Sequence, residues 1–499
     1  MSLSEQLSTP STAPAGGQGP ADPKAGRRQG YLIVAGTVVA AVLMVLAAQS
    51  DLPREAVGGI LLVLMLGLMA LNVPVGVAMG LTGVIGVLSL AGERPTIGLL
   101  AEGPFAAATN FSLTVIPMFV FMGLILWRSG VTADLYTAAK HWLSWLPGGL
   151  AITTNLAGAG LGAASGSTIG ITYALGRIGI PEMLKAGYDK RLATGAVMSS
   201  GTIGQLIPPS ILLVLFAGFA EVPVGPQLMA GIVPGIVLTL MYIVIVVGTV
   251  SLKPHWAPRD TSKTQLDWGV VWKDSAKCWP IPVIAFMIIG GMMSGWFTAT
   301  EAGAVGAMTA LVFALFRLGP REALRSGLTA LKDTVASVGG ILFVMIGATM
   351  LNRFLALSGT AQLFSDAVIA AGLPMLGLVA VLTVFYLVLG MFMDPIAMML
   401  LTVPILLPAA TAAGISPVWF GVFVVLMGEI AILSPPVGML AFITHKITRT
   451  REVNLGHDIT LMDVFKGALL FVPGALAVVF IMALFPELAT WLPGLTSSQ

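Results

Sequence analysis

Long apolar stretches separated by short polar connections run through most of this chain. A helix needs about 20 apolar residues to cross the ~30 Å hydrocarbon core of a bilayer, and most of the stretches approach that length. They cover residues 31–48, 57–72, 73–91, 111–127, 143–220, 227–250, 279–296, 300–316, 335–351, 374–444 and 467–486. Polar or proline-rich positions break 143–220 and 374–444. The pattern predicts an all-α polytopic membrane protein.

Composition excludes the other broad classes of protein. Of 499 residues, 57% are apolar and only 10% are charged, whereas a soluble domain has about 25% charged residues. The 25 basic and 23 acidic residues leave no basic surplus for a nucleic acid. A single cysteine, Cys278, and four scattered histidines form no recognisable metal or catalytic motif. We therefore expect a protein that is not an enzyme.

The basic residues predict an orientation in the membrane. They gather around 185–191, 251–277, 317–332 and 446–466, while 221–226 and 411–417 contain none. Because Lys and Arg collect on the cytoplasmic side, one alternating topology satisfies all of these connections and places the N-terminus inside. Residues 1–30 are rich in Ser, Pro, Gly and Ala, which predicts a disordered cytoplasmic tail.

An internal repeat is the strongest signal in the chain. Residues 180–211 align with 407–438 at an offset of 227, with nine identities in 32 positions and no gap. The connection 185–191 is basic and its counterpart 411–417 is uncharged, so the copies have opposite orientations. Inverted repeats of this kind place a binding site near the bilayer midplane, where the halves meet.

Each repeat contains two interruptions at membrane depth. Polar segments at 162–168 and 390–395 predict the tips of two re-entrant hairpins, and the pairs Pro208–Pro209 and Pro435–Pro436 break two spanning helices. Prolines leave carbonyl groups without donors, which is costly in lipid unless a ligand satisfies them. A hard monovalent cation suits such oxygens, and half-helix N-termini suit a carboxylate anion.

Isolated charged residues within the apolar stretches have alternative interpretations. Asp394 is a candidate both for capping a half-helix and for holding a cation. Glu429 either faces a water-filled cavity or pairs with a neighbouring helix. Glu301 follows a helix start and is expected to cap it. Arg177 either extends to the cytoplasm or pairs with a substrate carboxylate.

Several motifs together resemble the large membrane subunit of tripartite ATP-independent periplasmic (TRAP) transporters. They are Ser165–Ser167, Ile180–Lys185, Gly187–Tyr188, Gly204–Ser210, Asp394–Pro395, Val403–Pro408 and Ser434–Gly438. The resemblance implies inverted-topology repeats with two re-entrant hairpins and two broken helices. It also implies sodium-coupled import of a small organic acid by an elevator movement in the bacterial inner membrane. The implied partners are a small TRAP membrane subunit and a periplasmic substrate-binding protein.

The resemblance also implies site residues. The first sodium site would fall on Ser165, Ser167, Gly204, Ile207 and Pro209. The second would fall on Gly390, Asp394, Ser434 and Pro436. Substrate would lie between the hairpin tips, at Ser165, Gly166, Ser167, Thr168, Asp394 and Pro395.

The same interpretation divides the chain into functional segments. After the tail, residues 31–56 form an extra N-terminal helix and loop, and 57–127 and 227–334 form scaffold. The transport domain comprises 128–226 and 335–445, and 446–499 contain the last loop, helix and tail. A stand-alone sodium/carboxylate symporter of the same architecture is the alternative, and a membrane-embedded enzyme or assembly scaffold is a second one.

Overall fold

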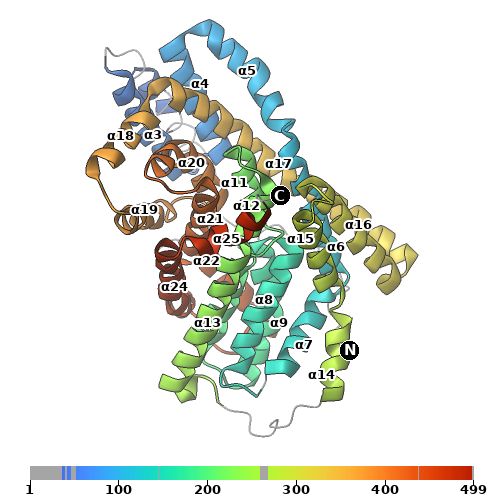
Figure 1. The fold of residues 1–499 in the computed structure, drawn as a ribbon. Helices are drawn as coiled ribbons and strands as arrows, with labels where there is room; N and C mark the ends of the chain where they lie inside the picture. Colours follow the sequence, from blue (N-terminus) through green and yellow to red (C-terminus); the bar gives the residue numbers. More distant parts are fainter. Residues whose placement is uncertain are drawn as a thin grey trace, which may run out of the picture. The chain divides into compact units, whose positions relative to one another are not determined.

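The structure is a computed structural model that describes residues 36, 38–39, 42–46, 52–143, 145–258, 268–435 and 438–496, without the side chains of 163–165 and 496. Throughout these residues the regular structure is helical (Figure 1). Six of the described helices are long and apolar enough to cross a membrane, or seven if the bent pair α14 (Trp268–Lys277) and α15 (Pro280–Met293) is one span. The expected tail 1–30 and most of the expected helix 31–48 lie outside the described residues.

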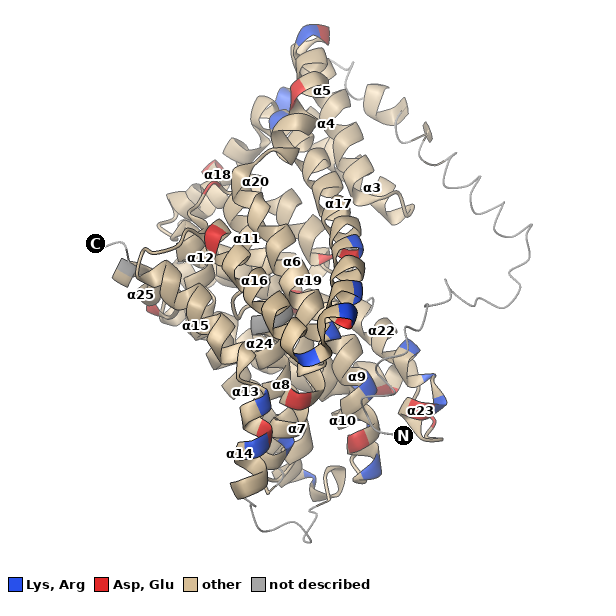
Figure 2. Cartoon of the chain, turned by 90° about the vertical axis from the view of Figure 1, so that its right-hand side faces the viewer, with Lys and Arg blue, Asp and Glu red and all other residues tan. Residues whose placement is uncertain are grey.

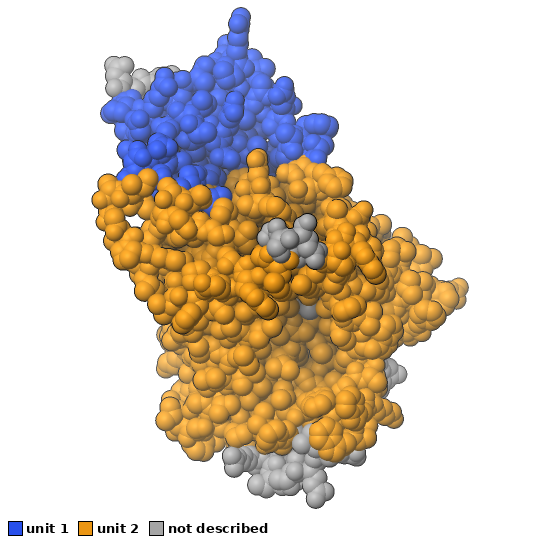
Figure 3. All heavy atoms as spheres, viewed as in Figure 1, with its two compact units in different colours: residues 1–109, 340–367, 404–409 blue, residues 110–339, 368–403, 410–499 orange. Residues whose placement is uncertain are grey.

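The chain divides into two compact units (Figure 3). Unit 1 contains residues 1–109, 340–367 and 404–409, and unit 2 contains the remainder. The helices of unit 1 are α3 (Arg54–Ala70), α4 (Val75–Ala91), α5 (Glu93–Ala108), the second half of α17 (Pro320–Ser358), most of α18 (Thr360–Ala371) and residues 404–409 of α20 (Pro395–Ala412).

In unit 1, α4 packs directly on the backbone of α17. A methyl group built on Gly83 would lie 2.5 Å from the carbonyl oxygen of Met350, and one on Gly76 would lie 3.0 Å from that of Phe343. Gly347 on α17 meets the backbone of Gly76 in the same way. Small residues permit this approach, which is how helices associate in a membrane without a hydrophobic driving force.

Unit 2 contains the first copy of the repeat and most of the second, of which residues 404–409 belong to unit 1. Its helices before the first copy are α6 (Val115–Arg128) and α7 (Val131–Leu143). The first copy comprises α8 (Gly149–Ser165), α9 (Thr168–Lys185), α10 (Lys190–Ile203) and α11 (Ile211–Phe219). The second comprises α19 (Met375–Leu389), α20 (Pro395–Ala412), α21 (Pro417–Leu433) and α22 (Met439–Thr448). Between and after them lie α12 (Val224–Ala230), α13 (Ile232–Leu252), α14, α15, α16 (Ala299–Leu318), α23 (Arg451–Asn454), α24 (Leu461–Leu484) and α25 (Glu487–Thr496).

One helix extends far beyond its expected span. The sequence predicts a span at 335–351 after a basic connection at 317–332, but α17 is a single 39-residue helix that begins at Pro320. Arg321, Arg325 and Lys332 are exposed on this helix. Long basic side chains are good helix formers, so the charges do not end the helix.

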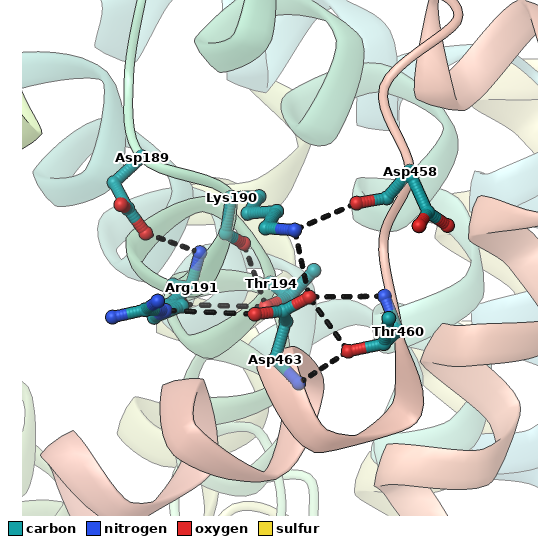
Figure 4. A network of polar contacts seen from close by, with 7 residues as sticks. All are labelled: Asp189, Lys190, Arg191, Thr194, Asp458, Thr460 and Asp463. Carbon is teal, nitrogen blue, oxygen red and sulfur yellow. Dashed lines mark hydrogen bonds and ion pairs between the residues drawn. The ribbon is translucent and has the colours of Figure 1, made fainter.

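Ion pairs join the basic connections of unit 2. Figure 2 shows charged residues gathered around the ends of α7, α9, α10, α14 and α23. Lys190 Nζ lies 2.8 Å from Oδ2 of Asp463, and Arg191 Nε lies 3.6 Å from Oδ1 of the same residue (Figure 4). Asp463 also accepts from Thr460 in a capping box at the start of α24. This network holds α10 against α24, where Gly195 and Gly467 bring the two backbones into contact.

Candidate functional site: two hairpin tips and two broken helices

The first hairpin turns at Gly166 and Ser167, between α8 and α9, within the expected segment. Gly166 has φ +54°, a left-handed conformation that glycine adopts without strain. The hydroxyl of Ser167 accepts a hydrogen bond from the N–H of Gly170 at 3.3 Å and so caps α9. Ser165 ends α8, and its side chain lies outside the described part of the chain.

The second hairpin turns between α19 and α20 and is capped by a carboxylate. Oδ1 of Asp394 accepts hydrogen bonds from the N–H groups of Ile396 at 3.0 Å and Ala397 at 3.1 Å. The capping interpretation of Asp394 is therefore confirmed. The hydroxyls of Tyr386 and Thr402 lie 2.6 Å apart and link the two arms of the hairpin.

The repeat offset of 227 relates the two caps. It takes Ser167 to Asp394 and Thr168 to Pro395, so each residue of the first turn has its counterpart in the second. Both counterparts, Ser167 and Asp394, accept the hydrogen bonds that cap their helices. One half of the molecule thus uses a neutral cap where the other uses an acidic one.

Both proline pairs interrupt helices, as the sequence predicts. The first break separates α10 from α11 at 204–210, and the second separates α21, which ends at Leu433, from α22, which begins at Met439. Among the hydrogen bonds of the described residues, none has the carbonyl oxygen of Gly204, Ile207, Pro209 or Gly390 as its acceptor. The hydroxyl of Ser434 donates to the carbonyl of Ile430 at 2.7 Å, and Pro436 lies outside the described residues.

The first hairpin tip lies against the first break. A methyl group on Gly162 would lie 2.9 Å from the carbonyl oxygen of Gly204, and one on Gly166 would lie 2.7 Å from that of Pro209. The side chain of Ile207 is turned toward Gly235 on α13. The structure thus brings the tip together with the carbonyl groups of Gly204 and Pro209.

The second tip packs on α21 in the corresponding way. A methyl group on Gly390 would overlap the side chain of Ala431, and one on Gly428 would lie 3.0 Å from Cβ of Pro395. Adding 227 to 201 and to 168 gives 428 and 395, so this contact of the first half recurs in the second, while Gly390 meets Ala431 one residue after the counterpart of Gly162. A methyl group on Gly201 would accordingly lie 2.9 Å from the carbonyl oxygen of Thr168.

The two tips meet at neighbouring residues of α21. Pro395 of the second tip touches Gly428, and the hydroxyl oxygen of Thr168 from the first tip lies 2.9 Å from both carboxyl oxygens of Glu429. The starts of α9 and α20 are therefore close together. Sequence reasoning named Glu429 and Thr168 separately but missed their contact, which joins opposite halves of the repeat and has no local signal.

Two other charged residues that the sequence singles out are Glu301 and Arg177. Glu301 forms a capping box with Thr298 at the start of α16, as expected. Arg177 is exposed, with its guanidinium 5.6 Å from the ring centre of Tyr173, and points to neither tip in a described contact. A pocket of about 400 Å³ between α22 and α24, lined in part by His445 and Arg449, shares no residue with the predicted site.

Comparison with known proteins agrees with this architecture. Residues 62–488 match the family model described as tripartite ATP-independent periplasmic transporter, DctM component. The C4-dicarboxylate TRAP transporter large permease protein DctM of Vibrio cholerae is 30% identical over 463 residues, which are 87% of this chain and 97% of that protein. The sialic acid TRAP transporter large permease protein SiaM of the same organism is 28% identical over 430 residues, 86% of this chain and 97% of that one.

A solved structure shares the fold at low sequence similarity. The YdaH transporter of Alcanivorax borkumensis aligns with a TM-score of 0.56 and 14% identity, covering 88% of this chain and 98% of its own.

Proposed function

The chain belongs to the family of the DctM component of tripartite ATP-independent periplasmic (TRAP) transporters, and from this premise we propose that it is the large permease subunit of a sodium-coupled uptake system. In this proposal it works in the inner membrane with a small membrane subunit. A periplasmic binding protein delivers a small organic acid, which an elevator movement of the hairpins and broken helices carries across. The observation that carries the proposal is the pair of capped hairpin tips meeting broken helices at repeat-related positions.

The first sodium site is proposed at the tip of the α8–α9 hairpin and the break after α10. Its ligands are the backbone carbonyls of Gly204, Ile207 and Pro209, with Ser165 and Ser167 from the tip. These carbonyls accept no hydrogen bond within the described structure, which is costly in a dry environment. A sodium ion would satisfy them, since hard cations prefer oxygen ligands.

The second sodium site is proposed at the other tip, on Gly390, Asp394, Ser434 and Pro436. Both capping bonds of Asp394 use Oδ1, so its Oδ2 is the oxygen available to the ion. Because Asp394 carries a negative charge, this site differs from the first in having a charged ligand.

The substrate anion is proposed to bind between the tips. The helices α9 and α20 begin at Thr168 and Pro395, both of which contact α21. Helix N-termini attract carboxylates, and the two relatives above are named for a C4-dicarboxylate and sialic acid, which are both carboxylates. Sodium at Asp394 offsets the negative charge next to the substrate, so each ligand raises the affinity for the other.

Uptake measurements in proteoliposomes test this function. The permease, its small subunit and the binding protein should together import the acid held by that binding protein, and only when a sodium gradient is directed inward. Omitting the binding protein should abolish uptake. Uptake by the permease alone would support the stand-alone symporter instead, and uptake driven equally well without sodium would refute sodium coupling.

A further inference from the structure

Glu429 is a carboxyl group buried in the interior of unit 2. It lies in the last turns of α21, before the second break, and its exposed fraction is 1%. The proposed sodium and substrate sites do not use it. Placing an ionised carboxylate in such surroundings is very costly unless a positive charge or several donors surround it.

The surroundings of Glu429 contain one hydroxyl partner. Both of its carboxyl oxygens lie 2.9 Å from the same atom, Oγ1 of Thr168. Among the described residues no Lys, Arg or His forms an ion pair with it. A threonine hydroxyl has one proton to donate, and an ionised carboxylate can only accept. The ionised form therefore receives a single proton shared between two oxygens.

A neutral acid fits the same geometry completely. Thr168 donates its proton to one carboxyl oxygen, and the other oxygen, carrying the acid proton, donates back to Oγ1 of Thr168. Two hydrogen bonds then satisfy the pair, with no charge buried.

On α13 the titratable side chain is Tyr242, whose hydroxyl lies 3.2 Å from Oγ1 of Thr202. A neutral tyrosine supplies no charge that would favour the carboxylate.

The remaining helices around α21 provide no compensating cation. α11 and α12 contain no titratable residue, and the hydroxyl of Tyr386 on α19 pairs with Thr402. α9, which carries Thr168, also contains Tyr173, Arg177, Glu182 and Lys185; Arg177 and Lys185 are exposed, and Glu182 pairs with Lys140. The titratable side chains of α10, α22, α24 and α25 lie toward the helix ends: Lys190, Arg191, His445, Lys446, Asp463, Lys466 and Glu487.

From this geometry we propose that Glu429 and Thr168 form a proton-binding site that joins the first hairpin tip to the second broken helix. The proton holds α9 against α21, and releasing it leaves a carboxylate that is stable only if the tip moves away or water enters. Proton binding and the position of the tip are thereby linked. The inference rests on the contact itself and does not require sodium-coupled uptake.

Infrared difference spectroscopy of the full-length protein in liposomes tests the site. At neutral pH the wild type should show the C=O stretching band of a protonated carboxylic acid, in sodium and in potassium buffer alike. Glu429→Gln should lose that band, and Glu301→Gln, at an exposed cap, should keep it. Thr168→Val should move the band to higher frequency, because the carbonyl oxygen loses its hydrogen-bond donor.

A stability measurement provides a second readout. Gln both donates and accepts, so Glu429→Gln imitates the neutral acid. The wild type should lose thermal stability as the pH rises above the ordinary pKa of an exposed Glu, because the unfolded chain then releases the proton that the folded site holds, and the variant should lack that component of the loss. The proposal would be overturned if the wild type showed no band of a protonated acid, or if that band were unchanged in Glu429→Gln. A band that appears only when sodium is withdrawn would also overturn it, in favour of a cation site. If Glu429→Gln fails to fold, a band that stays in place in Thr168→Val would overturn it.

Discussion

The cap of the second hairpin allows the charge of Asp394 to be separated from its structural role. In Asp394→Asn the side chain keeps the Oδ1 acceptor that binds the N–H groups of Ile396 and Ala397. Asn and Asp are about equally good N-caps, so the hairpin should remain folded. What the variant loses is the negative charge together with Oδ2, the oxygen proposed to bind sodium, which an amide NH2 group replaces. Asp394→Ala removes the cap as well and should cost a further 0.5–2 kcal/mol or so of stability.

The expected loss of affinity follows from removing a charged ligand. Interactions of charged partners contribute about 1.5–3 kcal/mol, which corresponds to an increase in Kd of about 10- to 100-fold. At a sodium concentration of about 100 times the wild-type Kd, the ion stabilises the wild type by about 2.7 kcal/mol. In Asp394→Asn the same concentration should stabilise by only about 1.4 to 0.4 kcal/mol.

Thermal unfolding across a sodium series, at constant ionic strength with potassium, measures this stabilisation directly. Thr298→Ala removes the cap of α16, far from the predicted site in sequence, and should lower stability without altering the sodium dependence. If Asp394→Asn responds to sodium as the wild type does, Asp394 is not a ligand, and the cap is its whole role.

Three further substitutions test packing contacts. Gly83→Val should lower stability by about 1–3 kcal/mol or prevent folding, because the new side chain meets the backbone of α17, whereas Gly80→Ala has room and should melt within a degree or two of the wild type. Gly201→Ala should displace the first hairpin tip and abolish uptake in a folded protein. Gly248→Ala, which faces open space, is its control. Normal uptake by Gly201→Ala would contradict the tip contact. Asp463→Asn should lower stability by about 1.5–3 kcal/mol by weakening the network that joins α10 to α24, and an unchanged melting temperature would show that the network is dispensable.

Much of the site could be predicted from the sequence because its signals are local or repeated. Polar residues and prolines within apolar stretches locate the two turns and the two breaks, and the repeat relates one half to the other. The pairing of Ser167 with Asp394 also follows from the offset of 227, once the caps identify which residue of each tip to compare.

Other features depend on contacts between distant segments and leave no periodic trace. The hydrogen bond of Thr168 with Glu429 joins residues 261 positions apart, and neither neighbourhood identifies the other. The length of α17 was also missed, since exposed basic residues indicate a connection in a hydropathy pattern although they are compatible with a helix. Helix α5 was missed as well, because its sequence is too polar to form an apolar stretch in the hydropathy pattern.

The backbone contact between α4 and α17 also limits how related sequences can vary. Where a main chain touches a main chain, no alternative side chain can be accommodated by changing its rotamer, so positions 76, 83 and 347 admit little beyond glycine. Gly59 and Gly67 on α3 have open space around them, so other residues can replace them. In an alignment of sequences that descend from a common ancestor, positions 76, 83 and 347 should therefore be nearly invariant, and positions 59 and 67 should not.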